Sequence, residues 1–129
     1  MGVSRKNKRK IVINDRIFYW CVKNDNEDDN RLYLVIISDD KKFLISYMLG
    51  QKDSQRIFSP KNPYIIVKGV EFKGLENLGH IWERFLVPEW NDEIVTPSLV
   101  AKIIVWSLKP EKVISVNYKG DIMSTRYSQ

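Results

Sequence analysis

The residues best suited to chemistry are the only histidine, His80, and its neighbours Glu83 and Arg84. If residues 79–85 form a helix, His80 shares a face with Glu83 and Arg84 at three- and four-residue spacing. A His–Glu pair can act as a general acid–base couple. Cys21 lies within an apolar strand pattern, where an inert buried thiol is the usual outcome. Catalysis by His80 and Glu83 is therefore one hypothesis, and the alternative is that both are surface residues.

Sequence motifs of common catalytic sites do not occur in the chain. We find no Gly-x-Ser-x-Gly nucleophile elbow, no Gly-x-x-x-x-Gly-Lys-Ser/Thr phosphate loop, no His-Glu-x-x-His zinc motif and no Gly-x-Gly-x-x-Gly after a strand. The single cysteine excludes an intramolecular disulfide, and no Cys/His spacing resembles a zinc site. We therefore expect a non-enzymatic protein with no cofactor and no bound metal.

Positive charge is concentrated at the N-terminus of the chain. Beyond residue 10 there are 16 basic and 16 acidic residues, so the formal net charge of +5 belongs to an arm formed by residues 1–10. A flexible, solvated terminus is the simpler interpretation of this arm, and binding to nucleic acid or to an acidic partner is the alternative. The basic residues of the arm are Arg5, Lys6, Lys8, Arg9 and Lys10.

Negative charge is concentrated in residues 24–30, which contain no apolar side chain. The acidic residues of this run are Asp25, Glu27, Asp28 and Asp29. The run lacks the central glycine and the terminal glutamate of a calcium-binding loop, so we reject that motif. We interpret it as a solvated loop whose carboxylates are candidates for contact with a basic partner.

Apolar side chains in irregular segments are further candidates for partner binding. In the polar loop of residues 50–63, Ile57 and Phe58 follow Arg56, and they either attach the loop to the core or contact a partner. Trp82 and Trp90 flank another irregular segment, and tryptophan is common in the energetic centres of protein interfaces. We therefore include these five residues among the candidate site residues.

The elements that must position these candidates are predicted from hydrophobic periodicity. Apolar, β-branched and aromatic runs indicate strands, and Asn14-Asp15 and Asp39-Asp40-Lys41 have the residue types of tight hairpin turns. The pattern predicts an α+β fold with an antiparallel sheet of about five or six strands built from consecutive hairpins. The predicted strands cover residues 10–13, 17–22, 31–38, 42–49, 64–72 and 113–118.

One long helix is predicted across this sheet, at residues 97–109. Thr96 can cap its amino end, Pro97 suits the first helical position, and Pro110 stops it. The charges of Asp92 and Glu93 also favour a helix start just after them. For residues 75–86, a short helix and a turn-rich crossover fit the apolar spacing equally well.

Length and hydropathy predict one small soluble domain. We expect a globular domain at residues 11–119 and a polar C-terminal tail at residues 120–129. The longest apolar run has six residues, Leu32 to Ile37, whereas a membrane span needs roughly 20. No apolar stretch near Met1 resembles a signal peptide, so we expect a cytoplasmic protein without membrane contact.

Taken together, these features favour a small protein-binding module. An inhibitor or an immunity-type protein that covers a partner surface is the class that fits best. Nucleic-acid binding through the basic arm is the first alternative, and an enzyme that uses His80 and Glu83 is the second.

Overall fold

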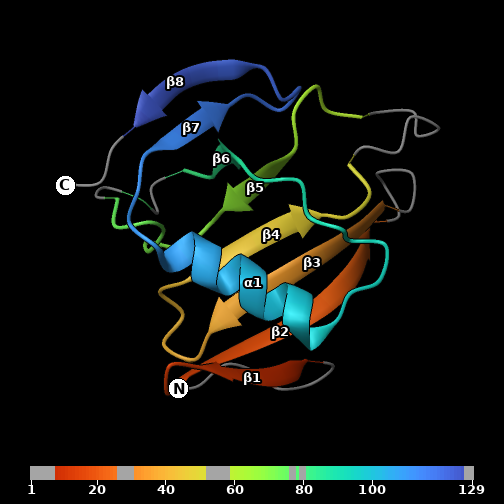
Figure 1. Cartoon of the computed structure of the whole chain (residues 1–129), viewed down its shortest axis with the longest axis vertical. Helices are drawn as coiled ribbons and strands as arrows, with labels where there is room; N and C mark the ends of the chain where they lie inside the picture. The colour runs from red at the N-terminus through yellow and green to blue at the C-terminus, as the bar shows by residue number, and fades with distance from the viewer. Residues whose placement is uncertain (1–7, 26–30, 52–58, 76–77, 79–80, 127–129) are drawn as a thin grey trace.

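A single antiparallel sheet and one helix account for the regular structure of the described residues, which are 8–25, 31–51, 59–75, 78 and 81–126. In this computed structural model the strands follow one another across the sheet in chain order, and each pairs antiparallel with the next. Figure 1 shows the helix lying across one face of the sheet, with the first and last strands at opposite edges. The elements are β1 Arg9–Ile13, β2 Arg16–Asp25, β3 Arg31–Ser38, β4 Leu44–Met48, β5 Tyr64–Val67, β6 Glu83–Leu86, α1 Pro97–Leu108, β7 Val113–Val116 and β8 Ile122–Arg126.

The α+β class, the antiparallel sheet and the single helix confirm the sequence prediction. The predicted number of strands is wrong, because the sheet has eight. Helix α1 begins at Pro97 as predicted and ends at Leu108, one residue earlier than predicted. It has only 12 residues, so the long helix of the prediction is a short one. No helix in the described ranges is long and apolar enough to cross a membrane.

Residues 75–86, for which a short helix was one prediction, contain strand β6 instead. Leu75, Leu78 and Phe85 are all buried, but the two leucines lie in the connection before the strand and only Phe85 lies within it. Their helix-like spacing therefore comes from two separate pieces of chain. Pairing of β6 with β5 supplies backbone hydrogen bonds that β5 would otherwise lack on that side.

The two edge strands extend the sheet beyond the predicted domain boundaries. Strand β1 begins at Arg9, so Arg9 and Lys10 belong to the sheet rather than to an arm. Strand β8 occupies residues 122–126, where a polar tail was predicted. Three of its five residues, Ser124, Thr125 and Arg126, are polar or charged, which suits the second half of an edge strand. The hydroxyl oxygens of Ser115 in β7 and Ser124 in β8 lie 2.7 Å apart.

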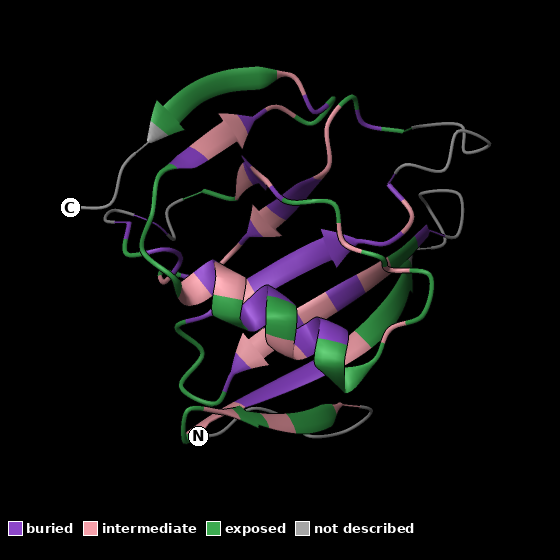
Figure 2. Ribbon diagram, viewed as in Figure 1, coloured by how far each residue is buried: buried purple, intermediate pink, exposed green. Residues whose placement is uncertain are grey.

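The core lies between α1 and the sheet face toward it. Alternate residues of the strands point to this face, and the buried residues of α1 recur at three- and four-residue steps to meet them. Figure 2 shows the buried residues concentrated along the central strands and the sheet side of the helix. The principal core residues are Phe18, Leu34, Ile36, Ile45, Ile65, Phe85, Leu99, Val100, Ile103 and Ile104.

The amino end of α1 is capped as its sequence predicts. The Thr96 hydroxyl oxygen accepts a hydrogen bond from the backbone N–H of Leu99 at 3.1 Å, which satisfies one of the free donors of the first turn. Within the helix, the buried Ser107 hydroxyl donates to the carbonyl oxygen of Ile103 at 2.7 Å, so this polar group inside the apolar face has a partner.

The carboxyl end of α1 is closed by a lysine from another part of the chain. The side chain of Lys73 is 0% exposed, and its ammonium donates to the carbonyl oxygens of Trp106 at 2.7 Å and Lys109 at 3.3 Å. It also donates to the Glu111 carboxylate at 2.6 Å and lies 4.0 Å from the centre of the Trp106 ring. Burial lowers the pKa of Lys73, whereas the hydrogen bond from Lys73 is the main cause that lowers the pKa of Glu111. The lysine therefore satisfies carbonyls that the helix itself leaves without donors.

Candidate binding cleft

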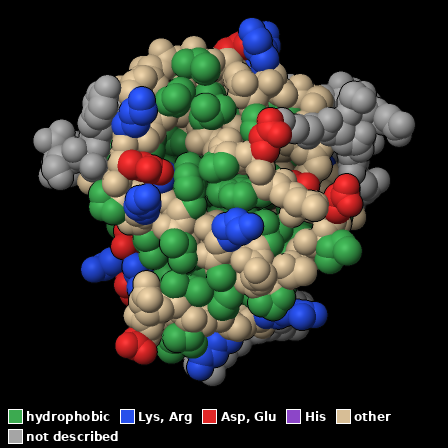
Figure 3. Space-filling model, in the orientation of Figure 1, with side chains coloured by type: hydrophobic (Ala, Val, Ile, Leu, Met, Phe, Trp, Pro, Cys, Tyr) green, Lys and Arg blue, Asp and Glu red, His purple; other side chains and the backbone are tan. Residues whose placement is uncertain are grey.

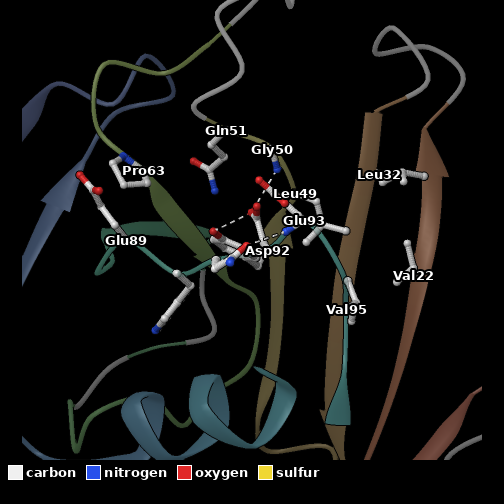
Figure 4. A pocket seen from close by; sticks show the side chains of 13 residues that line it. Val22, Leu32, Leu49, Gly50, Gln51, Pro63, Glu89, Asp92, Glu93 and Val95 are labelled. Carbon is white, nitrogen blue, oxygen red and sulfur yellow. Dashed lines mark hydrogen bonds between the residues drawn. The ribbon is translucent and has the colours of Figure 1, made fainter. Parts of the chain in front are cut away.

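A cleft opens beside the amino end of α1. It has a volume of about 930 Å³ and lies between the ends of strands β2, β3 and β4 and the segment of residues 89–95 that leads into the helix. Figure 4 shows the side chains that line it. They are Val22, Leu32, Tyr47, Leu49, Gly50, Gln51, Pro63, Glu89, Trp90, Asn91, Asp92, Glu93 and Val95.

One wall of the cleft is apolar and partly exposed. Val22 in β2 and Leu32 in β3 are 41% and 40% exposed, respectively. By the alternation of a strand they lie on the same sheet face as Trp20 and Leu34, which are buried in the core. Val95, on the segment that enters the helix, also lines the cleft (Figure 4). The apolar face that β2 and β3 turn toward the core therefore extends beyond the core, and Val22 and Leu32 form its exposed end.

The floor of the cleft is aromatic. Tyr47 of β4 is buried, and its ring lies 5.4 Å from that of half-buried Trp90 in an edge-to-face arrangement. Trp90 makes a second edge-to-face contact with Trp106 of α1, at 5.3 Å between ring centres. These contacts connect the floor of the cleft to the sheet on one side and to the helix on the other.

Asp92 is held in the cleft by two neutral donors. Its Oδ2 atom accepts hydrogen bonds from the Tyr47 hydroxyl at 3.0 Å and from the backbone N–H of Gly50 at 3.1 Å. Burial raises the pKa of Tyr47, and the negative charge of Asp92 raises it further. The hydroxyl therefore stays protonated at physiological pH and remains a donor to the carboxylate.

Among the described residues that line the cleft, all charged side chains have the same sign. Glu89, Asp92 and Glu93 are acidic, and none of the thirteen lining residues is Lys, Arg or His. Within the described ranges no Lys or Arg makes an ion pair with Asp92 or Glu93. Figure 3 shows acidic side chains on both sides of the face that carries α1, and those on the right lie where Figure 1 has the segment that precedes the helix.

A side-chain clamp fixes the wall next to Gly50. Gln51 is 2% exposed. Its side-chain oxygen Oε1 accepts a hydrogen bond from the backbone N–H of Tyr64 at 2.9 Å, and its side-chain nitrogen Nε2 donates to the backbone carbonyl oxygen of Tyr64 at 2.7 Å. The Ser59 hydroxyl donates to the backbone carbonyl oxygen of Gln51 at 2.5 Å. This wall is therefore tied to strand β5 by paired hydrogen bonds.

Among the candidate residues from the sequence, Trp90 lines the cleft. Trp82 does not line it: it precedes β6, is 62% exposed, and has the Lys68 ammonium 4.2 Å from its ring centre. Asp25 is the last residue of β2, three residues beyond Val22. The remaining loop and arm candidates lie outside the described residues, and they are Arg5, Lys6, Glu27, Asp28, Asp29, Arg56, Ile57 and Phe58.

The basic arm and the His80–Glu83 pair stay predictions in large part. Lys8 precedes β1, and in β1 the Arg9 guanidinium lies 5.5 Å from the ring centre of Trp20. His80 lies outside the described residues. Glu83 and Arg84 are neighbours in strand β6, so their side chains point to opposite faces rather than sharing a helix face with His80.

Cys21, which the sequence placed in a buried strand, is half-buried in β2. The strand assignment is right, and the complete burial is wrong. Strand alternation places Cys21 on the opposite face of β2 from Trp20 and Val22, and therefore away from the α1 core.

Several cleft residues did not emerge from the sequence as candidates. For Glu89, Asp92 and Glu93 a signal was present, because residues 88–95 place three carboxylates around a tryptophan in a short irregular segment. For Val22 and Leu32 no local signal exists, because their alternation with neighbouring residues is that of ordinary core positions.

In the part of the chain that the structure describes, no three His, Cys, Asp or Glu side chains form a group that could hold a metal ion. No protein-family model, no curated protein and no solved structure matches the chain. The cleft is therefore interpreted from its own residues.

Proposed function

We propose that the protein is a small non-enzymatic binding module that holds a segment of another protein in the cleft beside α1. An inhibitor or an immunity-type protein, which acts by covering a partner surface, is the class we favour. The observation that carries this proposal is the apolar wall, where Val22 and Leu32 lie on the core face of the sheet and yet remain about 40% exposed. An apolar surface that continues a core is a typical docking site for a partner.

The dimensions and rigidity of the cleft support the same function. Its volume of about 930 Å³ is at the upper end of the roughly 300–1,000 Å³ that is typical of binding pockets. The Tyr47–Asp92 and Gln51–Tyr64 hydrogen bonds fix its floor and one wall before any partner arrives. A preformed site loses little conformational entropy on binding, which favours affinity.

The proposal is tested with two valines that differ in position but match in chemistry. Val22 lines the cleft, whereas Val12 lies in β1 and is 52% exposed. We expect Val22→Glu and Leu32→Glu to weaken binding of the natural partner, captured from the organism that encodes the protein, by about ten-fold or more. Val12→Glu should leave binding unchanged. Affinity is measured by calorimetry once the partner has been identified.

Two results would contradict the proposal. One is a partner that binds the Val22→Glu and Leu32→Glu variants as tightly as it binds the Val12→Glu variant. The other is the absence of any specific partner for the wild-type chain. Thermal unfolding of each variant, together with the milder Leu32→Ala, separates loss of the cleft from loss of the fold.

A further inference from the structure

We infer that the segment held in the cleft is cationic and amphipathic, with a Lys or Arg side chain at Asp92 and an adjacent apolar side chain on Val22 and Leu32. This inference rests on the proposed function and adds the chemistry of the partner. It commits to a protein segment rather than to a nucleic acid, because a polyanion would be repelled by the acidic residues of the cleft.

The first argument is the sign of the charge. Glu89, Asp92 and Glu93 come from five consecutive positions, and the thirteen lining residues that the structure describes include no cation. In the described ranges Asp92 and Glu93 form no ion pair with Lys or Arg. An acidic segment would be repelled at short range, whereas a basic one is attracted and steered toward the cleft.

The second argument is the geometry of Asp92. Both of its hydrogen bonds, from the Tyr47 hydroxyl and the Gly50 N–H, go to Oδ2. Among the described residues no donor reaches the other carboxylate oxygen, Oδ1. The side chain is half-buried, so its orientation is fixed before binding. The guanidinium group of an arginine or the ammonium group of a lysine can donate a charge-assisted hydrogen bond to Oδ1.

The third argument is the arrangement of apolar and charged surface. Figure 4 shows Asp92 near the middle of the cleft, with Val22 and Leu32 on the strands to one side. Trp90 lines the same cleft and offers an aromatic surface to a cation or to the methylene groups of a long side chain. A segment that uses the whole cleft therefore needs a cationic and an apolar side chain close together.

The test uses a displayed library of random peptides of about 12 residues, panned against the full-length protein. We expect the enriched peptides to contain Lys or Arg beside Leu, Ile, Val, Met or Phe more often than the starting library does. Their binding should weaken as salt is raised from about 50 to about 500 mM, since the attraction is partly screened. Asp92→Asn should weaken binding by about ten-fold, because Asn keeps an oxygen for Tyr47 and Gly50 but removes the charge.

A matched control is Asp39→Asn, which removes an exposed carboxylate in the β3–β4 turn, away from the cleft residues. Binding by this variant should equal that of the wild type. Leu32→Ala serves as the variant that removes apolar surface from the cleft without altering Asp92 or the charge of the cleft.

The outcomes separate this inference from the proposed function. Neutral or acidic peptides that lose binding in Leu32→Ala would overturn the inference and leave the proposed function in place. The absence of peptides that depend on Leu32 would overturn both. Binding that appears only when Arg5, Lys6 and Lys8 are changed to Gln would show that the chain's own basic residues fill the cleft, and this too would overturn the inference.

Discussion

The two ends of helix α1 use charged side chains in opposite ways. At the carboxyl end, the Lys73 ammonium is buried and donates to two backbone carbonyls and to the Glu111 carboxylate. Before the amino end, one carboxylate oxygen of Asp92 accepts hydrogen bonds from two neutral groups, the Tyr47 hydroxyl and the Gly50 N–H. Asp92 lines an open cleft together with Glu89 and Glu93.

This difference separates a structural charge from a charge that is suited to binding. A buried ion needs a partner for each of its donors, so removal of the ion or of its partners is costly, and an ion whose donors are all used has nothing left to offer a binding partner. A carboxylate that is oriented by neutral groups keeps its charge available. We therefore expect substitutions at the carboxyl end to change stability and substitutions at the amino end to change binding.

The largest effect on stability is expected for Lys73→Met. The substitution leaves the carbonyls of Trp106 and Lys109 without their donor and removes the partner of Glu111, at a cost of about 3 kcal/mol in the free energy of unfolding. Urea titration measures this loss. Lys102→Met, which changes an exposed lysine of α1, is the control and should stay within about 0.5 kcal/mol of the wild type. Equal losses in both variants would show that Lys73 has no special role.

A smaller effect is expected for Thr96→Ala. Loss of the hydrogen bond from the Leu99 N–H should destabilise the protein by about 1 kcal/mol. Because Thr96 follows Val95, which lines the cleft, the same variant should also weaken peptide binding slightly. Thr96→Ser keeps the hydroxyl and should restore both properties. Failure of Thr96→Ser to restore stability would indicate that the methyl group matters more than the cap.

A third prediction concerns acid. The hydrogen bond from Lys73 lowers the pKa of Glu111 below 4.5 in the folded protein, so the unfolded chain takes up the proton first as pH falls. The stability that this pair provides is present above about pH 4.5 and is lost as pH falls through the folded pKa. Because Glu111 is partly exposed, we expect a contribution below about 1 kcal/mol. Denaturation at a series of pH values should show a shallower loss of stability below pH 4.5 for Glu111→Gln; an unchanged slope would contradict the assignment.

The smallest effect on stability is expected for Asp92→Asn, in contrast to its effect on binding. The amide oxygen can still accept from the Tyr47 hydroxyl and the Gly50 N–H, so the free energy of unfolding should change by less than about 0.5 kcal/mol. The same urea titration gives the value. A loss as large as that of Lys73→Met would remove the distinction between the two ends of the helix.

Features set by neighbouring residues could be predicted from the sequence. Thr96, Pro97 and Pro110 mark the ends of α1 through local backbone chemistry. The hairpin turn at Asn14 and Asp15 was likewise predicted, and both residues have positive φ, at 50° and 64°. In each case the information lies within a few residues of the feature.

Features set by tertiary packing could not be predicted. Strands β6 and β8 are short, and their backbone hydrogen bonds come from strands whose positions the sequence does not state. From its neighbours in the sequence Lys73 would be taken for a surface lysine, because its contact with the carboxyl end of α1 joins residues far apart in the chain. Val22 and Leu32 have the alternation of core residues, and only the position of α1 on the sheet leaves them exposed.

The chain-order sheet also has a consequence for how the protein is made. Each strand can pair with its predecessor as it leaves the ribosome, since no strand waits for a distant one. The helix that covers Phe18 and Ile36 ends only at Leu108, and it packs against strand β1 at the start of the chain. The apolar face of the first four strands therefore stays open to solvent, and to chaperones, until nearly the whole domain has been synthesised. Proteolysis of stalled nascent chains should show protection of these strands only when a C-terminal linker places Leu108 outside the ribosomal exit tunnel.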